Sequence, residues 1–308
     1  MKPETIKKLI IDTDPGHDDA LAILMLLKSK QFEIQAITTV AGNSPIENVT
    51  RNAQAMLDVV GCEAPVFSGL PNPLKRKLVT AVVHGSDGLA GFDTSQTCFR
   101  LTGDAPEKIV EIVRKFPGQV TILAIGPLSN IARALQIEPK LPELVAEIVI
   151  MGGAIDVPGN KSRVAEFNFF VDPEAADIVF KSSLRRTLVP LDLCMQTVLQ
   201  LEDFRAVKDE RLRGLLTPMM DHFIEGLRED EGTNGILAYD ALAAYVLLNR
   251  GAFGFAPMNI QIETKGEHTA GMSVAERRPY KQMTPNTQVA VNVDQTRFRQ
   301  GFFGTLSA

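Results

Sequence analysis

The sequence predicts an α/β fold with an open, mostly parallel, twisted sheet flanked by helices, a Rossmann-like arrangement that ends in a more helical C-terminal portion. Short runs of β-branched and aliphatic residues alternate with longer stretches of helical period, as in chains that form parallel sheets with crossover helices. The 308 residues are 45% hydrophobic and 22% charged, which is typical of a chain that buries a large core. Beyond residue 201 the helical stretches predominate.

Five apolar runs predict the strands of this sheet. They are mostly β-branched or aliphatic along their whole length, which indicates strands that helices cover on both faces. The predicted strands span residues 9–11, 34–40, 120–124, 148–151 and 187–191.

Stretches of helical period lie between and after these runs. Asp172, Pro173 and Glu174 have the order of an N-cap, a first-turn proline and an acidic first turn, so a helix is predicted to begin there. Residues 71–98 are weakly periodic and predict a surface loop or lid. No repeat or linker separates the elements, so residues 1–308 are predicted to form a single domain. The other predicted helices span residues 18–27, 45–60, 128–135, 217–228 and 240–248.

Composition and charge limit the possible partners. Lys and Arg number 32 against 37 Asp and Glu, and the net charge of -5 disfavours a nucleic-acid polymer as partner. No apolar run approaches the ~18 residues of a membrane span, and the polar first residues do not resemble a signal peptide. The three cysteines lie outside CxxC spacing and suit reduced thiols. We therefore expect a cytoplasmic protein without a membrane partner.

The strongest local signal is a group of four carboxylates between residues 12 and 19, where the first predicted strand passes into the first helix. Open α/β sheets bind ligands at the carboxyl ends of their strands. Four close carboxylates repel one another, and a hard divalent cation such as Ca2+ or Mg2+ would offset that repulsion. The alternative is that Asp18 and Asp19 are ordinary acids of a helix N-terminus. The four residues are Asp12, Asp14, Asp18 and Asp19.

Other predicted strands also end in groups that suit a ligand site. Asn43 follows the second strand and Ile125 follows the third, where its carbonyl could face a cation. Asn160 comes later, and alternation along 166–173 predicts that Glu166 and Asn168 share one face of an extended segment. Such polar groups among aromatic rings suit a hydroxyl-rich ligand with a flat part, such as a nucleoside. Ordinary loop chemistry and a polar sheet edge are the alternatives.

Five segments, taken in order, resemble those of the inosine-uridine type nucleoside hydrolases. They read DTDPGHDDA, TVAGN, AIGPLSNIA, IVIMGGA and AEFNFFVDPEAA, and the resemblance covers roughly the whole chain. It implies a calcium ion as cofactor and a ribonucleoside as substrate. It also implies hydrolysis of the N-glycosidic bond to free base and ribose, with calcium-bound water as nucleophile. Members of the family are commonly homodimers or homotetramers, so the same assembly is expected here.

The resemblance also implies roles for individual residues. Asp14 is expected to be the general base in addition to binding the metal, and His84 is expected near the base of the nucleoside. The implied metal ligands are Asp14, Asp19, the Ile125 carbonyl and Asp240. The implied ribose-binding residues are Asp18, Asn43, Asn160, Glu166 and Asn168.

One position departs from the family pattern. Many members have a histidine directly before the last metal-binding aspartate, where it protonates the departing base, whereas this chain has Tyr239 before Asp240. A phenol is the weaker acid, so Tyr239, His84, His222 or a water molecule could supply the proton. His17 is expected behind the site or exposed. Purine or pyrimidine preference stays open.

Two other functions compete with hydrolysis. A nucleoside-binding protein with weak or lost turnover would follow if Tyr239 cannot replace the histidine. A metal-dependent phosphohydrolase is suggested by the Asp12-Thr13-Asp14 spacing, but Pro15 follows it and no partner motif with a lysine is evident.

Overall fold

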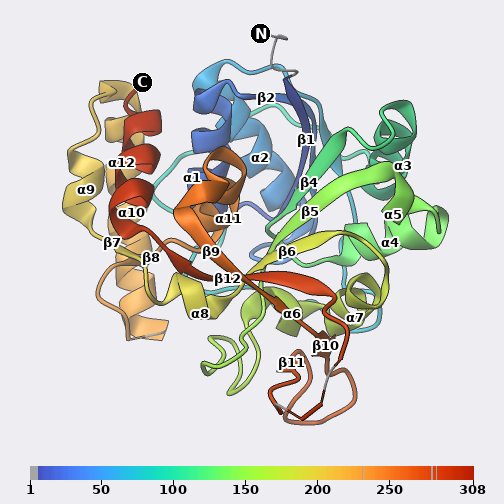
Figure 1. The fold of residues 1–308 in the computed structure, drawn as a ribbon. Coiled ribbons are helices and arrows are strands. Elements are labelled where there is room, and N and C mark those ends of the chain that lie inside the picture. Colours follow the sequence, from blue (N-terminus) through green and yellow to red (C-terminus); the bar gives the residue numbers. More distant parts are fainter. Residues whose placement is uncertain (1–5, 231, 279, 282) are drawn as a thin grey trace, which may run out of the picture.

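In the computed structural model, which describes residues 6–230, 232–278, 280–281 and 283–308, an eight-stranded sheet runs between two layers of helices (Figure 1). The strand order is β3-β2-β1-β4-β5-β6-β12-β9. Neighbours from β3 to β12 pair in parallel, and β9 pairs antiparallel with β12 at the edge. The predicted open and mostly parallel sheet is therefore confirmed.

The bounds of the elements follow from the backbone. The strands of the main sheet are β1 (Lys7–Thr13), β2 (Phe32–Thr39), β3 (Val66–Ser68), β4 (Val120–Ala124), β5 (Val145–Met151), β6 (Arg186–Val189), β9 (Phe253–Met258) and β12 (Thr287–Val293). Two small antiparallel pairs join β7 (Val198–Leu199) to β8 (Ile236–Leu237) and β10 (Ile260–Ile262) to β11 (Ser273–Ala275). The helices are α1 (His17–Ser29), α2 (Ile46–Val60), α3 (Ala105–Lys115), α4 (Ser129–Ile137), α5 (Leu141–Leu144), α6 (Phe167–Val171), α7 (Pro173–Lys181), α8 (Leu191–Cys194), α9 (Leu201–Arg205), α10 (Glu210–Asp230), α11 (Tyr239–Leu248), the short 3-10 helix η1 (Arg250–Ala252) and α12 (Gln295–Leu306).

Two hydrophobic cores lie on opposite faces of the sheet. Successive residues of β1 alternate between them, with Leu9 and Ile11 in the core under α1, α2 and α11, and Ile10 in the core under α3, α4 and α7. This alternation follows from the two-residue period of a strand. Because both faces are covered, the strands need apolar residues on both sides, which explains their continuous apolar sequences.

The helices and strands predicted from the sequence are present, with shifted ends. The strand predicted at 187–191 ends at Val189, because Pro190 precedes α8, which begins at Leu191. The helix start at Asp172 is confirmed, since its carboxylate accepts a hydrogen bond from the Ala175 amide. Residues 69–104, all of them described, contain no helix or strand, as predicted for most of this segment.

The extended segment predicted around Glu166 and Asn168 is wrong. The Glu166 carboxylate accepts hydrogen bonds from the amides of Asn168 and Phe169, and so it caps the short helix α6. A side chain that satisfies the first amides of a helix favours the helix over a strand.

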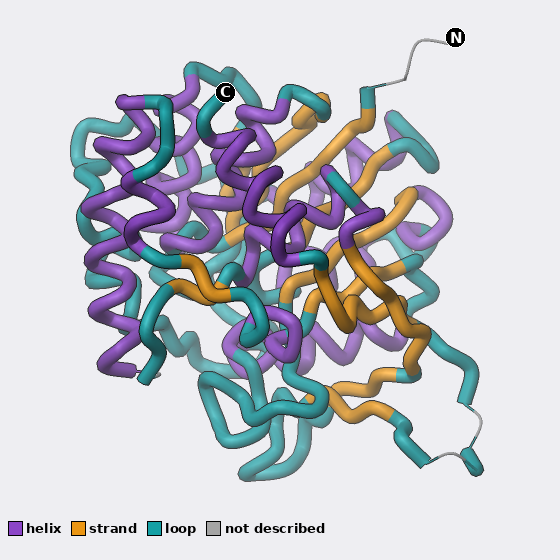
Figure 2. Tube along the Cα trace, turned by 60° about the vertical axis from the view of Figure 1, so that its left-hand side comes forward, coloured by secondary structure: helices purple, strands orange, loops and turns teal. Residues whose placement is uncertain are grey.

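The carboxyl ends of the parallel strands point to one end of the molecule, where loops gather (Figure 2). Helix α10 and the loop between β3 and α3 lie over this end and add side chains to it. None of the helices in the described part of the chain combines the length and apolarity that a membrane span requires.

Candidate functional site

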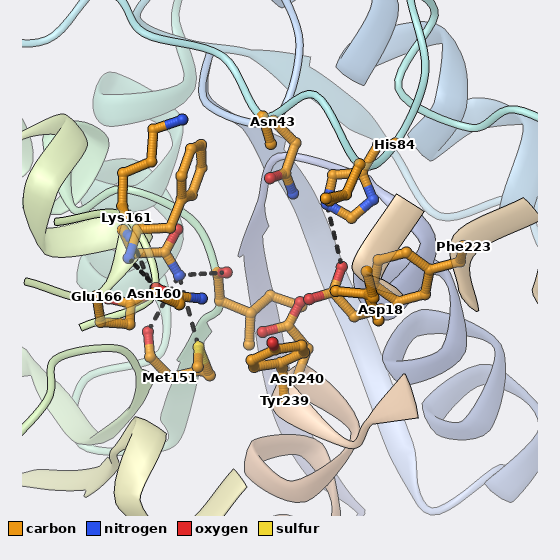
Figure 3. A pocket seen from close by; sticks show the side chains of 16 residues that line it. Asp18, Asn43, His84, Met151, Asn160, Lys161, Glu166, Phe223, Tyr239 and Asp240 are labelled. Atoms are coloured by element: carbon orange, nitrogen blue, oxygen red, sulfur yellow. Dashed lines mark hydrogen bonds and ion pairs between the residues drawn. The ribbon is translucent and has the colours of Figure 1, made fainter. Parts of the chain in front are cut away.

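A pocket lies at the carboxyl ends of β4 and β5, and about half of its lining side chains are polar (Figure 3). In the close-up, Asp18 and His84 face Glu166 and Asn160 across the pocket, with Asn43 on one side and Tyr239 and Asp240 on the other. The lining residues are Asp18, Asn43, Ala81, Val83, His84, Ile125, Met151, Asn160, Lys161, Glu166, Phe167, Asn168, Phe223, Leu227, Tyr239 and Asp240.

A carboxylate cluster, made of Asp14, Asp18, Asp19 and Asp240, lies at the start of α1 and α11. One oxygen each from Asp18, Asp19 and Asp240 lies within 4.8 Å of the others, although Asp240 is remote in sequence. Asp18 and Asp19 lie in the first turn of α1 and Asp240 lies in the first turn of α11, so each acid sits at a positive helix end. The three side chains could hold a metal ion.

Asp14 is a fully buried member of the carboxylate cluster. Its Oδ2 accepts a hydrogen bond of 2.6 Å from the Asn43 amide. Its Oδ1 is buried and has no hydrogen-bond partner among the described residues. A Cβ on Gly42 would lie 2.1 Å from Oδ2, and one on Gly126 would lie 2.5 Å from Oδ1. The two glycines therefore leave the room that this carboxylate needs.

Asp19 and Asp240 are buried as deeply. Asp19 accepts hydrogen bonds from the hydroxyl of Thr13, the amide of Gly16 and the side chain of Asn43. Asp240 Oδ1 is buried without a hydrogen-bond partner in the described part of the chain.

The electrostatics of the carboxylate cluster disfavour several negative charges at once. Burial, and then the charges of neighbouring acids, hold the pKa values of Asp14 and Asp240 well above their usual range. Burial also raises the pKa of Asp19, and it raises the pKa of Asp12 from 3.8 to about 7. A cation among these groups would allow all of them to ionise.

The set of metal ligands implied by the resemblance partly coincides with the closest acids. Asp19 and Asp240 belong to the group within 4.8 Å, and the third member is Asp18, which the resemblance assigns to ribose. Asp14 is not in that group, but its pKa is raised by the charges of Asp19 and Asp18. The Ile125 carbonyl lines the pocket and accepts a hydrogen bond of 3.0 Å from Asn168.

The residues expected to bind ribose all line the same pocket. The side chain of Asn160 accepts a hydrogen bond from the Phe167 amide, and the Glu166 carboxylate accepts one of 2.8 Å from the Gly153 amide. The Asn168 amide group donates to the carbonyls of Ile125 and Met151. Backbone groups therefore hold these side chains in place before a ligand arrives.

An imidazole wall, made of His17, His84 and Phe223, closes the other side of the site. His84 Nε2 lies 3.8 Å from Asp18 Oδ1, and His84 Nδ1 lies 3.0 Å from His17 Nδ1. Both imidazole rings stack on Phe223, with centroid distances of 4.9 and 5.0 Å. Burial lowers the pKa of His17 to about 4 and the pKa of His84 well below its usual range, so both rings are neutral near pH 7.

Three further residues of interest, Tyr239, His222 and His17, lie in or behind the pocket. Tyr239 is buried and lines the pocket, whereas His222 lies behind it with its ring centroid 6.1 Å from that of His17. His17 is buried behind His84, which was one of the two positions expected for it. Sequence reasoning missed Phe223 and Leu227, whose i,i+4 spacing on a predicted helix was the available signal.

Comparisons with known proteins give a consistent result. The family model of the inosine-uridine preferring nucleoside hydrolases matches residues 9–300. The chain is 36% identical to the pyrimidine-specific ribonucleoside hydrolase RihA of Citrobacter koseri, with 97% of this chain and 96% of that protein covered. The RihA protein of Salmonella enteritidis is 37% identical with the same coverage.

Solved structures extend the likeness to the fold. A plant nucleoside hydrolase is 31% identical, covers 99% of this chain and 100% of its own, and has a TM-score of 0.90. A purine-preferring ribonucleoside hydrolase from Gardnerella vaginalis is also 31% identical, covers 98% of both chains and has a TM-score of 0.87.

Proposed function

This chain belongs to the inosine-uridine preferring nucleoside hydrolase family, and we propose that it uses a calcium ion to hydrolyse pyrimidine ribonucleosides. It is a ribonucleoside hydrolase, which cleaves the N-glycosidic bond to give free base and ribose. The pyrimidine preference is supported by the printed specificity of the RihA relatives, which are 36–37% identical. A purine-preferring relative is 31% identical, so base preference has to be measured.

The observation that carries the proposal is the convergence of Asp18, Asp19 and Asp240 beside a pocket whose far side holds Glu166 and Asn168. A cluster of buried carboxylates next to hydrogen-bonding side chains suits a cation and a polyhydroxyl ligand together. Neither feature alone would identify the substrate.

The residues fit a hard cation. The buried Oδ1 atoms of Asp14 and Asp240 have no hydrogen-bond partner in the described residues, and a metal ion would supply the missing contacts. All donors are oxygens, which favour Ca2+ or Mg2+, and calcium accepts the larger number of protein oxygens. The proposed ligands are Asp14, Asp19, the Ile125 carbonyl and Asp240.

Different side chains carry out the separate steps of the proposed reaction. When bound, calcium would acidify the attacking water and bind ribose hydroxyls. The Asp14 carboxylate takes the proton from the attacking water, while the Asn43 amide holds its Oδ2. Cleavage builds positive charge on the sugar ring, and the Glu166 carboxylate stabilises it from across the pocket. The hydroxyls of ribose are bound by Asp18, Asn43, Asn160, Glu166 and Asn168.

The departing base needs a proton on the opposite side of the sugar. Tyr239 and His84 both line the pocket, and we propose that the Tyr239 hydroxyl donates this proton while the neutral His84 binds the nucleoside as a hydrogen-bond acceptor. A nucleoside-binding protein without turnover is not favoured, because the relatives that match 97% of the chain are named as hydrolases.

A panel of ribonucleosides, assayed for released ribose with and without chelator, tests the proposal. We expect uridine and cytidine to be hydrolysed faster than inosine, loss of activity with chelator, and better recovery with calcium than with magnesium. The substrate 2'-deoxyuridine is the matched control, because it lacks a hydroxyl that the site would bind. Full activity in chelator would contradict the metal assignment, and faster cleavage of inosine would contradict the base preference.

We further propose a cytoplasmic homodimer or homotetramer. The family resemblance supports the assembly, and the free thiols of Cys62, Cys98 and Cys194 suit a reducing compartment. Light scattering coupled to size exclusion would give the number of subunits, and a mass near 33.6 kDa would contradict an oligomer.

A further inference from the structure

Two buried imidazoles share a hydrogen bond behind the pocket. His17 is the first residue of α1, and His84 comes from the loop between β3 and α3. Their Nδ1 atoms lie 3.0 Å apart, which is a hydrogen-bonding distance. A hydrogen bond between two nitrogens needs one hydrogen, so one ring must donate it and the other must accept it.

Ala90 decides which ring donates. Its carbonyl oxygen lies 2.8 Å from His17 Nε2, and a carbonyl can only accept, so the hydrogen of His17 is on Nε2. A neutral imidazole carries one hydrogen, which leaves His17 Nδ1 bare. The hydrogen between the two rings therefore belongs to His84 Nδ1, and the neutral His84 has no hydrogen on Nε2.

A weaker contact favours the opposite assignment. The backbone amide of His17 lies 3.3 Å from His84 Nδ1 and would donate to it if that nitrogen were bare. Two bare nitrogens would then face each other at 3.0 Å, where their lone pairs repel. The shorter contact outweighs the longer one, and the first amides of a helix have no partner within the helix in any case.

We propose that His17 is a positioning residue that fixes neutral His84 as the Nδ1–H tautomer and so turns a bare Nε2 toward the substrate pocket. His84 Nε2 lies 3.8 Å from Asp18 Oδ1, which is beyond hydrogen-bonding distance, and Asp18 lines the pocket. It then accepts a hydrogen bond from an O–H or N–H group of the ribonucleoside. Any proton that His84 exchanges with the substrate passes through Nε2, because Nδ1 stays bonded to His17. The kinetic consequence rests on the proposed function, whereas the tautomer does not.

Nuclear magnetic resonance of the ring nitrogens tests the tautomer directly. The chain has only four histidines, so protein labelled with 15N-histidine gives a simple long-range proton–nitrogen spectrum, and single substitutions assign it. We expect the ring hydrogen on Nε2 in His17 and on Nδ1 in His84, without any substrate present. A hydrogen on Nε2 of His84 would overturn the proposal.

Two substitutions of His17 distinguish its hydrogen bond to His84 from its packing against Phe223. His17→Phe keeps a ring against Phe223 but removes the acceptor, whereas His17→Asn removes the ring but offers its side-chain oxygen near the place of Nδ1. We expect the His84 hydrogen to move to Nε2 in His17→Phe and to stay on Nδ1 in His17→Asn. With uridine, kcat should fall about tenfold or more in His17→Phe and stay within about threefold of wild type in His17→Asn, with smaller changes in KM.

If kcat instead falls in His17→Asn and stays near the wild-type value in His17→Phe, His17 acts through packing and the proposal is overturned. Circular dichroism and thermal unfolding check that both variants fold, and the wild-type spectrum decides the question if His17→Phe does not. A wild-type protein that shows the expected tautomer but hydrolyses no ribonucleoside would refute the proposed function and leave the tautomer assignment intact.

Discussion

The carboxylate cluster and the imidazole wall form opposite kinds of surface around one pocket. The carboxylate cluster lies at the end of β1 and the starts of α1 and α11, and it gathers like charges that burial makes costly. The imidazole wall stacks rings that burial keeps neutral. Under the proposed function, the charged side would bind a cation and stabilise the positive sugar, and the neutral side would fix the direction of hydrogen bonds.

The largest effect is expected from the charged side. Asp14→Asn should lower kcat for uridine by about a thousandfold or more, because an amide cannot take the proton of the attacking water. Ribose release under saturating substrate measures it. Circular dichroism and thermal unfolding of Asp14→Asn are the control for local distortion, because the amide has nearly the size of the carboxylate that it replaces. Residual activity within tenfold of wild type would show that Asp14 is not the base.

Tyr239 lies beside Asp240 in the pocket, and its substitution tests whether its hydroxyl activates the leaving group. Tyr239→Phe keeps the buried ring and removes the hydroxyl, so kcat for uridine should fall about ten- to a hundredfold. A 4-nitrophenyl riboside should be affected much less, because its leaving group departs as a stable anion. Comparison of the two substrates in Tyr239→Phe and in His84→Gln measures the share of each residue. If Tyr239→Phe lowers kcat equally for both substrates, the Tyr239 hydroxyl does not activate the leaving group and Tyr239 serves only in packing.

The two sides differ in how far the sequence alone predicts them. Three members of the carboxylate cluster lie within six residues of one motif, at a strand end where a site is expected. The motif alone therefore predicts that these three acids lie close together. The imidazole wall joins His17 of that motif to His84 from a loop without periodicity and to Phe223 from α10, and no local pattern brings Phe223 to His84. The Glu166 error has the same origin. Alternation of residue types resembled a strand, but a capping carboxylate decided the local structure.

The charged side also predicts how stability depends on pH when metal is removed. Asp12 has a pKa of 3.8 normally and of about 7 in the folded chain, so the folded state holds a proton that the unfolded state loses. Its contribution to stability is fully present below pH 3.8 and is lost as the pH rises to about 7. The raised pKa values of Asp14, Asp19 and Asp240 act in the same direction.

The lowered pKa values of His17 and His84 act in the opposite direction below pH 6.5, so the effect of the acids is measured above it. Chelated protein should therefore have a free energy of unfolding higher at pH 6.5 than at pH 8, by on the order of a few kcal/mol. Urea denaturation at the two pH values measures the difference. Asp12→Asn should reduce it, and added calcium should reduce it further by favouring the ionised acids. A free energy of unfolding that stays constant or rises between these pH values would contradict the raised pKa values of the buried acids.

The smallest effect is expected at Phe223, where only the stacking of the imidazole wall changes. Phe223→Leu keeps an apolar side chain against the pocket but removes a ring that contacts both His17 and His84. Aromatic pairs contribute about 0.5–1.5 kcal/mol beyond their buried area, so KM or kcat for uridine should change about three- to tenfold. Phe204→Leu is the matched control, because Phe204 is equally buried but packs on Phe302 and Phe303 away from the pocket. It should lower stability and leave KM unchanged. If both variants change stability alone, the rings of the imidazole wall serve only to fill space, and the orientation of His84 must be fixed by its hydrogen bond to His17.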